Sequence, residues 1–318
     1  MTRQPRPDIL TDLRRHHATG EPGLPERLAQ AGLRPVTGGR NNTVYAWDPG
    51  PGHPTEIIKL YRTDDRGRGG REWTALTHLH GAHPGDAPEP LWEDLDHVQP
   101  AMGMTYLPGT SLPETASDQH PTALKALAAV HGRIQALPIP AALADTPRVD
   151  HWAHCTRRLT DVWPVQLADA ADDPATPTMH RLLRAWHDHD DQHGHRTYQD
   201  TPVLSRGDSN LLNWLWSPAE TRIRCVDFEF IGHSTAAYDA AELTEHISAR
   251  DIPDHLWEEI LPDLGVTTSL RPAYESAQRT CALRWLAVLW KQRTRRTPEF
   301  EAQLVRAASL LDSPAMIG

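Results

Sequence analysis

Two kinds of hydrophobic pattern alternate along this chain. Short apolar runs bounded by turn residues predict strands, and they lie at residues 43–47, 56–61, 98–106, 203–205 and 223–226. Longer stretches with apolar residues at helical spacing predict helices, and they lie at residues 24–33, 71–79, 123–134, 273–290 and 298–311. The pattern therefore predicts strands in the first third of the chain and again around residue 210, with helices over much of the remainder.

Polar residues of a particular kind interrupt the strands around residue 210. Asp208 lies in a Gly-Asp turn after the first of these strands, Asn213 follows five residues later, and Asp227 ends the last apolar run. This is the layout of a phosphoryl-transfer catalytic loop, in which one Asp accepts the hydroxyl proton while an Asn and a later Asp hold magnesium. Gly-Asp turns are also common in ordinary loops, so the order and spacing of all three residues carry the interpretation.

These residues resemble the catalytic loop of the aminoglycoside phosphotransferase and choline kinase-like family. That loop reads His-Gly-Asp, four residues and Asn, and is followed later by Asp-Phe-Glu or Asp-Trp-Glu. Gly207, Asp208, Asn213 and the segment 227–229 all match. The resemblance implies an α+β, two-lobed protein-kinase-like fold. It implies a small antiparallel-sheet N-terminal lobe at residues 1–104 and a mostly helical C-terminal lobe at residues 105–318.

One position departs from the family pattern, because Arg206 stands where the family usually has His. A buried guanidinium needs a carboxylate partner, since an unpaired buried charge is very costly. We therefore expect Arg206 to hold the loop through a charge-assisted pair with Asp227 or Asp239. Decay of the loop in an inactive relative is the alternative.

Lys59 is a candidate functional residue because lysine is rare in this chain. Lys and Arg total 32, and only three of them are lysines, at positions 59, 125 and 291. Lys59 lies inside an apolar strand, where the resemblance implies that it contacts the ATP phosphates and pairs with Glu72 on the next helix. An edge-strand lysine that blunts aggregation is the alternative.

Two further segments complete the nucleotide site that the resemblance implies. Gly38 and Gly39 precede an apolar run and predict a hairpin turn. In the family this hairpin folds over the nucleotide phosphates. The strand ending in Leu-Pro-Gly matches the segment that joins the lobes, where the backbone of Met104 and Tyr106 is expected to hydrogen-bond the adenine.

Composition narrows the class of partner. The chain has 318 residues, 39% of them hydrophobic, and a formal net charge of -10. This balance argues against a nucleic-acid partner and is compatible with a cationic substrate. The three cysteines include no Cys-x-x-Cys pair, and no apolar run approaches the roughly 18 residues of a membrane span. We expect a cytoplasmic protein with no signal peptide and no membrane contact.

Several other titratable residues are open to two interpretations. Asp239 is expected to cap a helix or to brace the catalytic loop. Glu242, Glu245 and His246 follow it at helical spacing and could line the acceptor pocket or face solvent. His131 is expected to be a packed core residue. Residues 186–195 alternate His and Asp and could hold zinc or nickel, although a solvated helix end is the simpler interpretation.

The resulting hypothesis is an ATP- and magnesium-dependent phosphotransferase acting on a hydroxyl of a small molecule. Asp208 would be the base, and Asn213 and Asp227 would hold magnesium. An aminoglycoside-like or other cationic antibiotic is one candidate acceptor. The alternatives are a metabolite kinase for choline, homoserine or a sugar, and a nucleotide-binding pseudokinase. The pattern leaves the oligomeric state open.

Overall fold

The computed structural model describes residues 7–19, 23–36, 42–48, 50, 55–63, 66–144, 151–189, 191 and 201–312. Two compact units divide the chain. The first comprises Met1–Gly109, Pro140–Pro147 and Arg224–Ile231, and the second comprises Thr110–Ile139, Arg148–Ile223 and Gly232–Gly318. The first unit thus includes the later segment that carries the Asp-Phe-Glu motif. The domain boundary between residues 104 and 105 stays a prediction.

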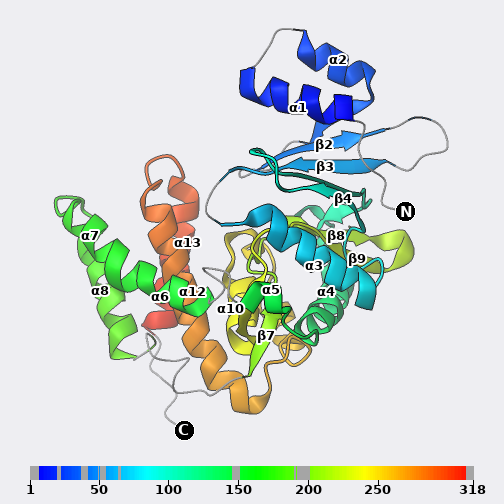
Figure 1. Ribbon diagram of the computed structural model, residues 1–318. Coiled ribbons are helices and arrows are strands. Elements are labelled where there is room, and N and C mark those ends of the chain that lie inside the picture. The colour runs from blue at the N-terminus through cyan, green and yellow to red at the C-terminus, as the bar shows by residue number, and fades with distance from the viewer. Residues whose placement is uncertain are drawn as a thin grey trace. The chain divides into compact units, whose positions relative to one another are not determined.

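A five-stranded antiparallel sheet forms the centre of the first unit (Figure 1). In spatial order its strands are β1 (Leu33–Val36), β2 (Thr43–Trp47), β3 (Glu56–Leu60), β5 (Ala101–Thr105) and β4 (Pro90–Asp94). Of the three inner strands, β3 and β5 are almost wholly buried, which agrees with their nearly continuous apolar sequences. The strands predicted in this part of the chain are confirmed.

Helices cover both faces of this sheet. Figure 1 shows α1 (Pro7–Thr19) and α2 (Leu24–Gln30) on one face and α3 (Arg68–Ala82) on the other. The short helix α5 (Ala141–Ala144) contacts α3. Ile58 and Leu60 pack with α1 and α2, and successive side chains of a strand point to opposite faces. Lys59, which lies between them, therefore points to the face that α3 covers.

Gly32 marks the end of the first predicted amphipathic helix. Its φ is +82°, and a Cβ at this position would lie 2.2 Å from the carbonyl oxygen of Asp48. Only glycine fits such an approach without strain. The predicted helix at residues 24–33 is confirmed, but it ends at Gln30 because β1 begins at Leu33.

Helices dominate the second unit. In chain order they are η1 (Leu112–Glu114), η2 (Ser117–Gln119), α4 (His120–Gln135), α6 (His151–Arg157), η3 (Arg158–Val162), α7 (Trp163–Ala168), α8 (Thr176–Asp188), η5 (Leu211–Asn213), η6 (Pro218–Glu220), α10 (Ala236–Glu245), η7 (Ile247–Ala249), α11 (Asp254–Ile260), η8 (Thr268–Leu270), α12 (Arg271–Trp290) and α13 (Thr297–Leu311). The segment η3 is a π-helix, and the other η segments are 3₁₀ helices. The core of this unit includes Trp163, Trp186, Leu286 and Trp290. Since α12 packs against both α10 and α13, it is the central helix of the group.

Short strands support the loop around residue 210. β7 (Pro202–Ser205) pairs antiparallel with β10 (Gly232–Thr235). A second small sheet has the order β6 (Thr110–Ser111), β8 (Trp214–Ser217) and β9 (Arg222–Cys225). The two strands predicted around this loop are confirmed as β7 and β9, and β9 ends two residues before Asp227. Strand β8 was not predicted.

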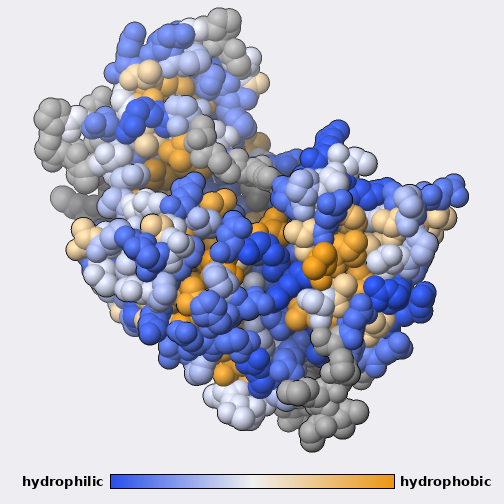
Figure 2. Space-filling view, turned by 180° about the vertical axis from the view of Figure 1, so that it is seen from behind, coloured by the Kyte–Doolittle hydropathy of each residue, from blue (hydrophilic) through white to orange (hydrophobic). Residues whose placement is uncertain are grey.

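Hydrophilic residues dominate the face of the molecule that Figure 2 shows, with apolar residues in small groups between them. Scattered apolar side chains are normal on protein surfaces and indicate no function by themselves. Within the described ranges, none of the helices combines the length and apolar character that crossing a bilayer requires.

Candidate active site

Lys59 is the centre of a charge cluster in the first unit. Its side chain is buried, with 6% of the residue exposed. Its Nζ lies 2.6 Å from Oε2 of Glu72 and 2.6 Å from Oδ1 of Asp227. Burial alone lowers the pKa of this ammonium, but the charges of Asp227 and Glu72 outweigh burial and raise the pKa. Lys59 is therefore a permanent cation held between two carboxylates, and the alternative of a solvent-facing edge lysine is wrong.

Glu72 anchors this cation from α3. Its carboxylate also accepts hydrogen bonds from the Tyr61 hydroxyl, at 2.7 Å, and from the backbone N–H of Phe228, at 3.1 Å. Burial raises the pKa of Glu72, and the adjacent Lys59 opposes that rise. The predicted ion pair between Lys59 and Glu72 is confirmed as a contact, and its role in nucleotide binding stays a prediction.

Asp227 adopts an uncommon backbone conformation. Its φ is +66°, and among the described residues only Thr221 is another non-glycine residue with positive φ. Asp tolerates this region better than most residues, but it still costs energy. Strain of this kind clusters at functional sites. The Asp227 side chain keeps 32% of its surface exposed, so it remains accessible after contacting Lys59.

Glu229, the last residue of the Asp-Phe-Glu motif, is fully buried and organises the rest of that segment. It accepts a hydrogen bond from Arg68 Nη1 at 2.6 Å and another from the Asn42 amide. Arg71, one turn along α3, donates to the carbonyl of Ile231 at 3.0 Å. Sequence reasoning missed both arginines. The available signal was the placement of Arg68 and Arg71 on the helical face that also carries Glu72.

The proposed hinge residues lie at the end of β5, the strand beside β3. Met104 is buried, whereas Tyr106 is half exposed. The Tyr106 amide donates to the carbonyl of Thr55 at 3.2 Å. Their contact with adenine stays a prediction. Gly38 and Gly39, the other predicted phosphate-binding residues, lie outside the described part of the chain.

The predicted catalytic loop lies in the second unit, between β7 and β8. Gly207 has a φ of +69°, which turns the chain so that Asp208 follows directly. Oδ1 of Asp208 accepts from the backbone N–H of Asn210, and Oδ2 accepts from Nδ2 of Asn213, both at 3.1 Å. These bonds fix the Asp208 carboxylate and place the amide of Asn213 beside it. The structure thus brings together the predicted base and one predicted metal ligand.

Asp239 braces this loop from α10. It accepts a 2.5 Å hydrogen bond from the Ser205 hydroxyl, whose oxygen in turn accepts from the backbone N–H of Gly207 at 3.1 Å. Asp239 also accepts a hydrogen bond from Gln135. The capping alternative is wrong, because Thr235 caps α10 with its own side chain. Burial raises the pKa of Asp239 to about 7, partly opposed by the Ser205 hydrogen bond.

Arg206 is buried beside the same brace. Its guanidinium carbon lies 5.1 Å from the centre of the Trp214 ring, a cation–π arrangement. Its charge is one of the influences that lower the pKa of Asp239. The expected burial of Arg206 is confirmed, and its pairing with Asp227 or Asp239 stays a prediction. His131 is buried in this region as expected, and burial followed by the charge of Arg206 lowers its pKa to about 4, so it is neutral near pH 7.

Glu242, Glu245 and His246 are all buried, so the expectation that they could face solvent is wrong. Glu242 Oε1 accepts from Arg284 Nη1 at 2.7 Å. Glu245 Oε1 accepts from Arg306 Nη2 at 2.6 Å. Both carboxylates are therefore neutralised by arginines from neighbouring helices.

The two residues predicted to hold magnesium both have oxygen atoms in their side chains. Magnesium prefers carboxylate and amide oxygens, which Asp227 and Asn213 offer. Across the described ranges, no group of three His, Cys, Asp or Glu side chains is arranged to hold a metal ion. Half of the His- and Asp-rich stretch at residues 186–195 lies outside those ranges. The zinc or nickel hypothesis therefore gains no support.

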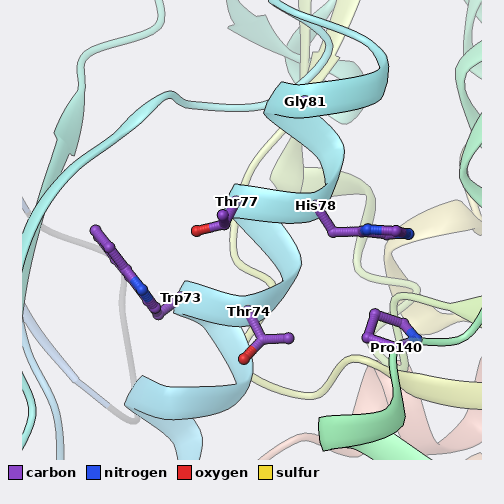
Figure 3. A pocket seen from close by; sticks show the side chains of 6 residues that line it. All are labelled: Trp73, Thr74, Thr77, His78, Gly81 and Pro140. Atoms are coloured by element: carbon purple, nitrogen blue, oxygen red, sulfur yellow. The ribbon is translucent and has the colours of Figure 1, made fainter.

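A hollow of about 470 Å³ lies on α3 and is distinct from this charge cluster (Figure 3). Its lining residues are Trp73, Thr74, Thr77, His78, Gly81 and Pro140. Helical residues are spaced by about 100°, so the lining residues of α3 share the face opposite Glu72, Ala75, Leu76 and Leu79. The hollow consequently receives none of the predicted site residues.

Comparison with solved structures shows the fold. A thermostable mutant of aminoglycoside phosphotransferase APH(4)-Ia, in a ternary complex with ADP and hygromycin B, is similar at a TM-score of 0.65 and 14% identity, covering 92% of this chain and 98% of that chain. A choline/ethanolamine kinase family protein from Mesorhizobium loti is similar at a TM-score of 0.63 and 17% identity, covering 96% of both chains. A GDP and kanamycin complex of APH(2")-IIia has a TM-score of 0.58 and 15% identity, covering 87% of this chain and 92% of that chain. The predicted α+β, two-lobed protein-kinase-like fold is confirmed.

Sequence comparison defines the family. Among curated protein sequences, none matches this chain. A family model described as the phosphotransferase enzyme family matches residues 32–279, which include both the Lys59 cluster and the catalytic loop. Because that match covers well over half of its length, this chain belongs to the phosphotransferase enzyme family.

Proposed function

We propose that this protein transfers the γ-phosphoryl group of ATP to a hydroxyl of a small molecule. Family membership supports a small-molecule phosphotransferase. The observation that carries the proposal is the position of Lys59, whose ammonium lies 2.6 Å from both Glu72 and Asp227. Kinases use this combination of strand lysine, helix glutamate and Asp-Phe-Gly-type aspartate to position nucleotide phosphates.

The residues divide the chemistry between them. Lys59 supplies a preorganised positive charge for the phosphate oxygens. Asp208, fixed by two hydrogen bonds, orients the acceptor hydroxyl and accepts its proton. Magnesium, held by Asn213 and Asp227, would neutralise charge on the phosphates. The structural neighbours include complexes with ADP, AMP-PNP and GDP, which supports nucleotide binding but leaves ATP and GTP as rival donors.

The phosphoryl acceptor, like the nucleotide donor, has more than one candidate. Structural neighbours carry hygromycin B, kanamycin and gentamicin, and another is a choline/ethanolamine kinase family protein. An aminoglycoside-like antibiotic and a metabolite alcohol are both consistent with those relatives. The pseudokinase alternative predicts nucleotide binding without turnover. It receives no support from the loop, since the Asp208 and Asn213 side chains are present and ordered by mutual hydrogen bonding.

The test combines binding with turnover. ATP with magnesium should raise the melting temperature of the wild type, and ADP release should be detected with at least one member of a panel of hydroxyl compounds. Asp208→Ala should lose turnover while its affinity for ATP and magnesium, measured by calorimetry, stays within about threefold, because Asp208 serves the acceptor side. Chelation of magnesium with EDTA should abolish both readouts. Nucleotide binding without ADP release for any compound would favour the pseudokinase, and full turnover by Asp208→Ala would remove it as the base.

A further inference from the structure

The loop that carries Asp208 is held at both ends by one segment, which consists of α10 and the short turn η7 that follows it. At the start of the loop, Asp239 on α10 holds the backbone N–H of Gly207 through an intervening serine. At the other end, the backbone N–H of Leu211 donates to the Ser248 hydroxyl oxygen at 2.9 Å. The contacts of α10 with β7 and of η7 with η5 agree with this arrangement (Figure 1). Asp208 therefore lies between two attachment points on the same segment.

Ser248 provides the acceptor that the first residue of η5 lacks within its own loop. The N–H of Leu212 donates to the Asn210 side chain at 3.2 Å, and the N–H of Asn213 donates to the Asn210 carbonyl at 3.0 Å. The N–H of Leu211 instead bonds to a residue 37 positions away. A backbone N–H that is withdrawn from water needs such an acceptor, since leaving it unpaired is costly. Ser248 thus fixes the start of the turn that ends with Asn213.

His246 in turn fixes the hydroxyl of Ser248. Its Nδ1 accepts from the backbone N–H of Ser248 at 3.1 Å and lies 2.6 Å from the Ser248 hydroxyl oxygen. Because Nδ1 accepts from an N–H, the ring proton lies on Nε2, and the hydroxyl donates to Nδ1. The hydroxyl oxygen is then left to accept from Leu211. Burial, and after it the charges of nearby arginines, lower the pKa of His246 to about 3, so the ring keeps this neutral form near pH 7.

The ring of His246 is itself held by α12. It lies edge-on to the ring of Trp285, with 4.5 Å between the ring centres and an angle of 81° between the planes. His246 also caps η7, but a cap requires only the bond from the N–H of Ser248. The hydroxyl of Ser248 adds a link from this cap to the loop at Leu211. The arrangement therefore does more than begin a short helix.

We propose that His246 and Ser248 are positioning residues for phosphoryl transfer, which hold the loop so that Asp208 and Asn213 keep their mutual hydrogen bond. This inference rests on the proposed function, because it concerns the same loop and the same reaction. The bonds run from His246 through Ser248 to Leu211, two residues before Asn213. A displacement of about 1 Å in a reacting group can cost about 10²-fold in rate. Loss of either side chain should consequently lower kcat rather than weaken substrate binding.

Substitution of Ser248 tests the link to the loop. Ser248→Ala should lower kcat by about tenfold or more, while the KM values of ATP and of an active acceptor stay within about threefold. Ser248→Thr keeps the hydroxyl and should retain most of the activity. Ser309→Ala is the matched control, because Ser309 is exposed on α13 and its hydroxyl donates to the carbonyl of Arg306. A wild-type kcat for Ser248→Ala would overturn the proposal.

Two substitutions of His246 separate its hydrogen bonds from its packing. His246→Phe keeps an aromatic ring against Trp285 but has no acceptor, so its kcat should fall as in Ser248→Ala. His246→Asn keeps an acceptor oxygen near the position of Nδ1 but has no ring, so it should retain most of kcat. The opposite order would assign His246 to packing and overturn its role. His97→Phe is the control, since His97 accepts from the N–H of Gln99 at 3.0 Å in an exposed turn of the first unit.

Amide hydrogen exchange of residues 207–213, measured by mass spectrometry, tests the positioning without nucleotide or turnover. Ser248→Ala and His246→Phe should exchange faster in this segment by about fivefold or more, while α12 and α13 keep wild-type rates. Faster exchange in these variants, together with a wild type that releases no ADP, would support the positioning and contradict the phosphotransferase proposal. Unchanged exchange would overturn the positioning whatever the turnover. Circular dichroism shows whether His246→Phe is folded, and Ser248→Ala, which removes a single oxygen, decides the question if it is not.

Discussion

Replacing Lys59 with methionine isolates the charge at the centre of the site. Methionine keeps much of the length and apolar character of the lysine stem but removes the cation. Two carboxylates, Glu72 and Asp227, each lie 2.6 Å from the Lys59 nitrogen, so both lose their partner at once. Glu72 is the more affected because its side chain is only 1% exposed, whereas Asp227 retains contact with solvent.

The size of the effect follows from that burial. Removing one partner of a buried ion pair costs about 3–5 kcal/mol, because an uncompensated charge stays behind. Domains are commonly stable by roughly 5–15 kcal/mol, so we expect Lys59→Met to fold with a lower free energy of unfolding. Turnover should fall by at least about 10²-fold, since a preorganised charge contributes several kcal/mol to the transition state.

Urea denaturation and ADP release measure the two effects separately. Lys125→Met is the matched control, because Lys125 is exposed on α4 and its replacement should change neither quantity. The double variant Lys59→Met/Glu72→Gln should recover part of the stability without recovering turnover, since it removes the stranded carboxylate. Burial already raises the pKa of Glu72, and loss of Lys59 removes the main opposing charge. The folded variant therefore binds a proton more tightly, and its stability deficit should shrink from about pH 8 to about pH 5.

Two results would refute this reasoning. Near-normal turnover by Lys59→Met, with an unchanged melting temperature, would show that Lys59 is a structural strand residue. A double variant less stable than Lys59→Met at every pH would show that Glu72 acts through its hydrogen bonds to Tyr61 and Phe228 rather than as a stranded charge.

Three further predictions address the remaining site residues. Asp227→Ala should abolish magnesium-dependent ATP binding measured by calorimetry, and unchanged affinity would remove Asp227 from the site. Arg206→Ala should lower both the melting temperature and kcat, and Arg206→His should recover part of each. A variant with wild-type values would leave Arg206 without a role in the loop. Burial raises the pKa of Asp239 to about 7, so the stability that its protonated form contributes is lost as pH rises through that value. Asp239→Asn should therefore flatten the dependence of melting temperature on pH between about 5 and 8, and an unaltered slope would assign the dependence to other groups.

Local pattern determined much of the fold in advance. Apolar runs and helical spacing predicted β2, β3, β5, β7 and β9 and the helices α4, α12 and α13, because the spacing of apolar residues along the sequence reflects which residues are buried. The spacing from Asp208 to Asn213 is also local, and their hydrogen bond at 3.1 Å spans a single loop. Lys59 and Glu72 were predictable as a pair because they lie on adjacent elements, a strand and the helix that follows it.

Other features required the tertiary structure. Glu229 accepts a hydrogen bond from Arg68, which lies 161 positions away in the sequence, and Asp239 accepts one from Ser205, which lies 34 positions away. Contacts between residues so far apart cannot be predicted from the periodicity of the sequence. The positive φ of Asp227 likewise depends on the contacts that hold its segment. The sequence alone allowed Glu242 to face solvent or the acceptor. In the fold, Arg284 from another helix forms an ion pair with Glu242, and the carboxylate is buried. Sequence fixes which side chains carry charge, but pairing and burial set the energy of each charge, and both depend on residues that only folding brings together.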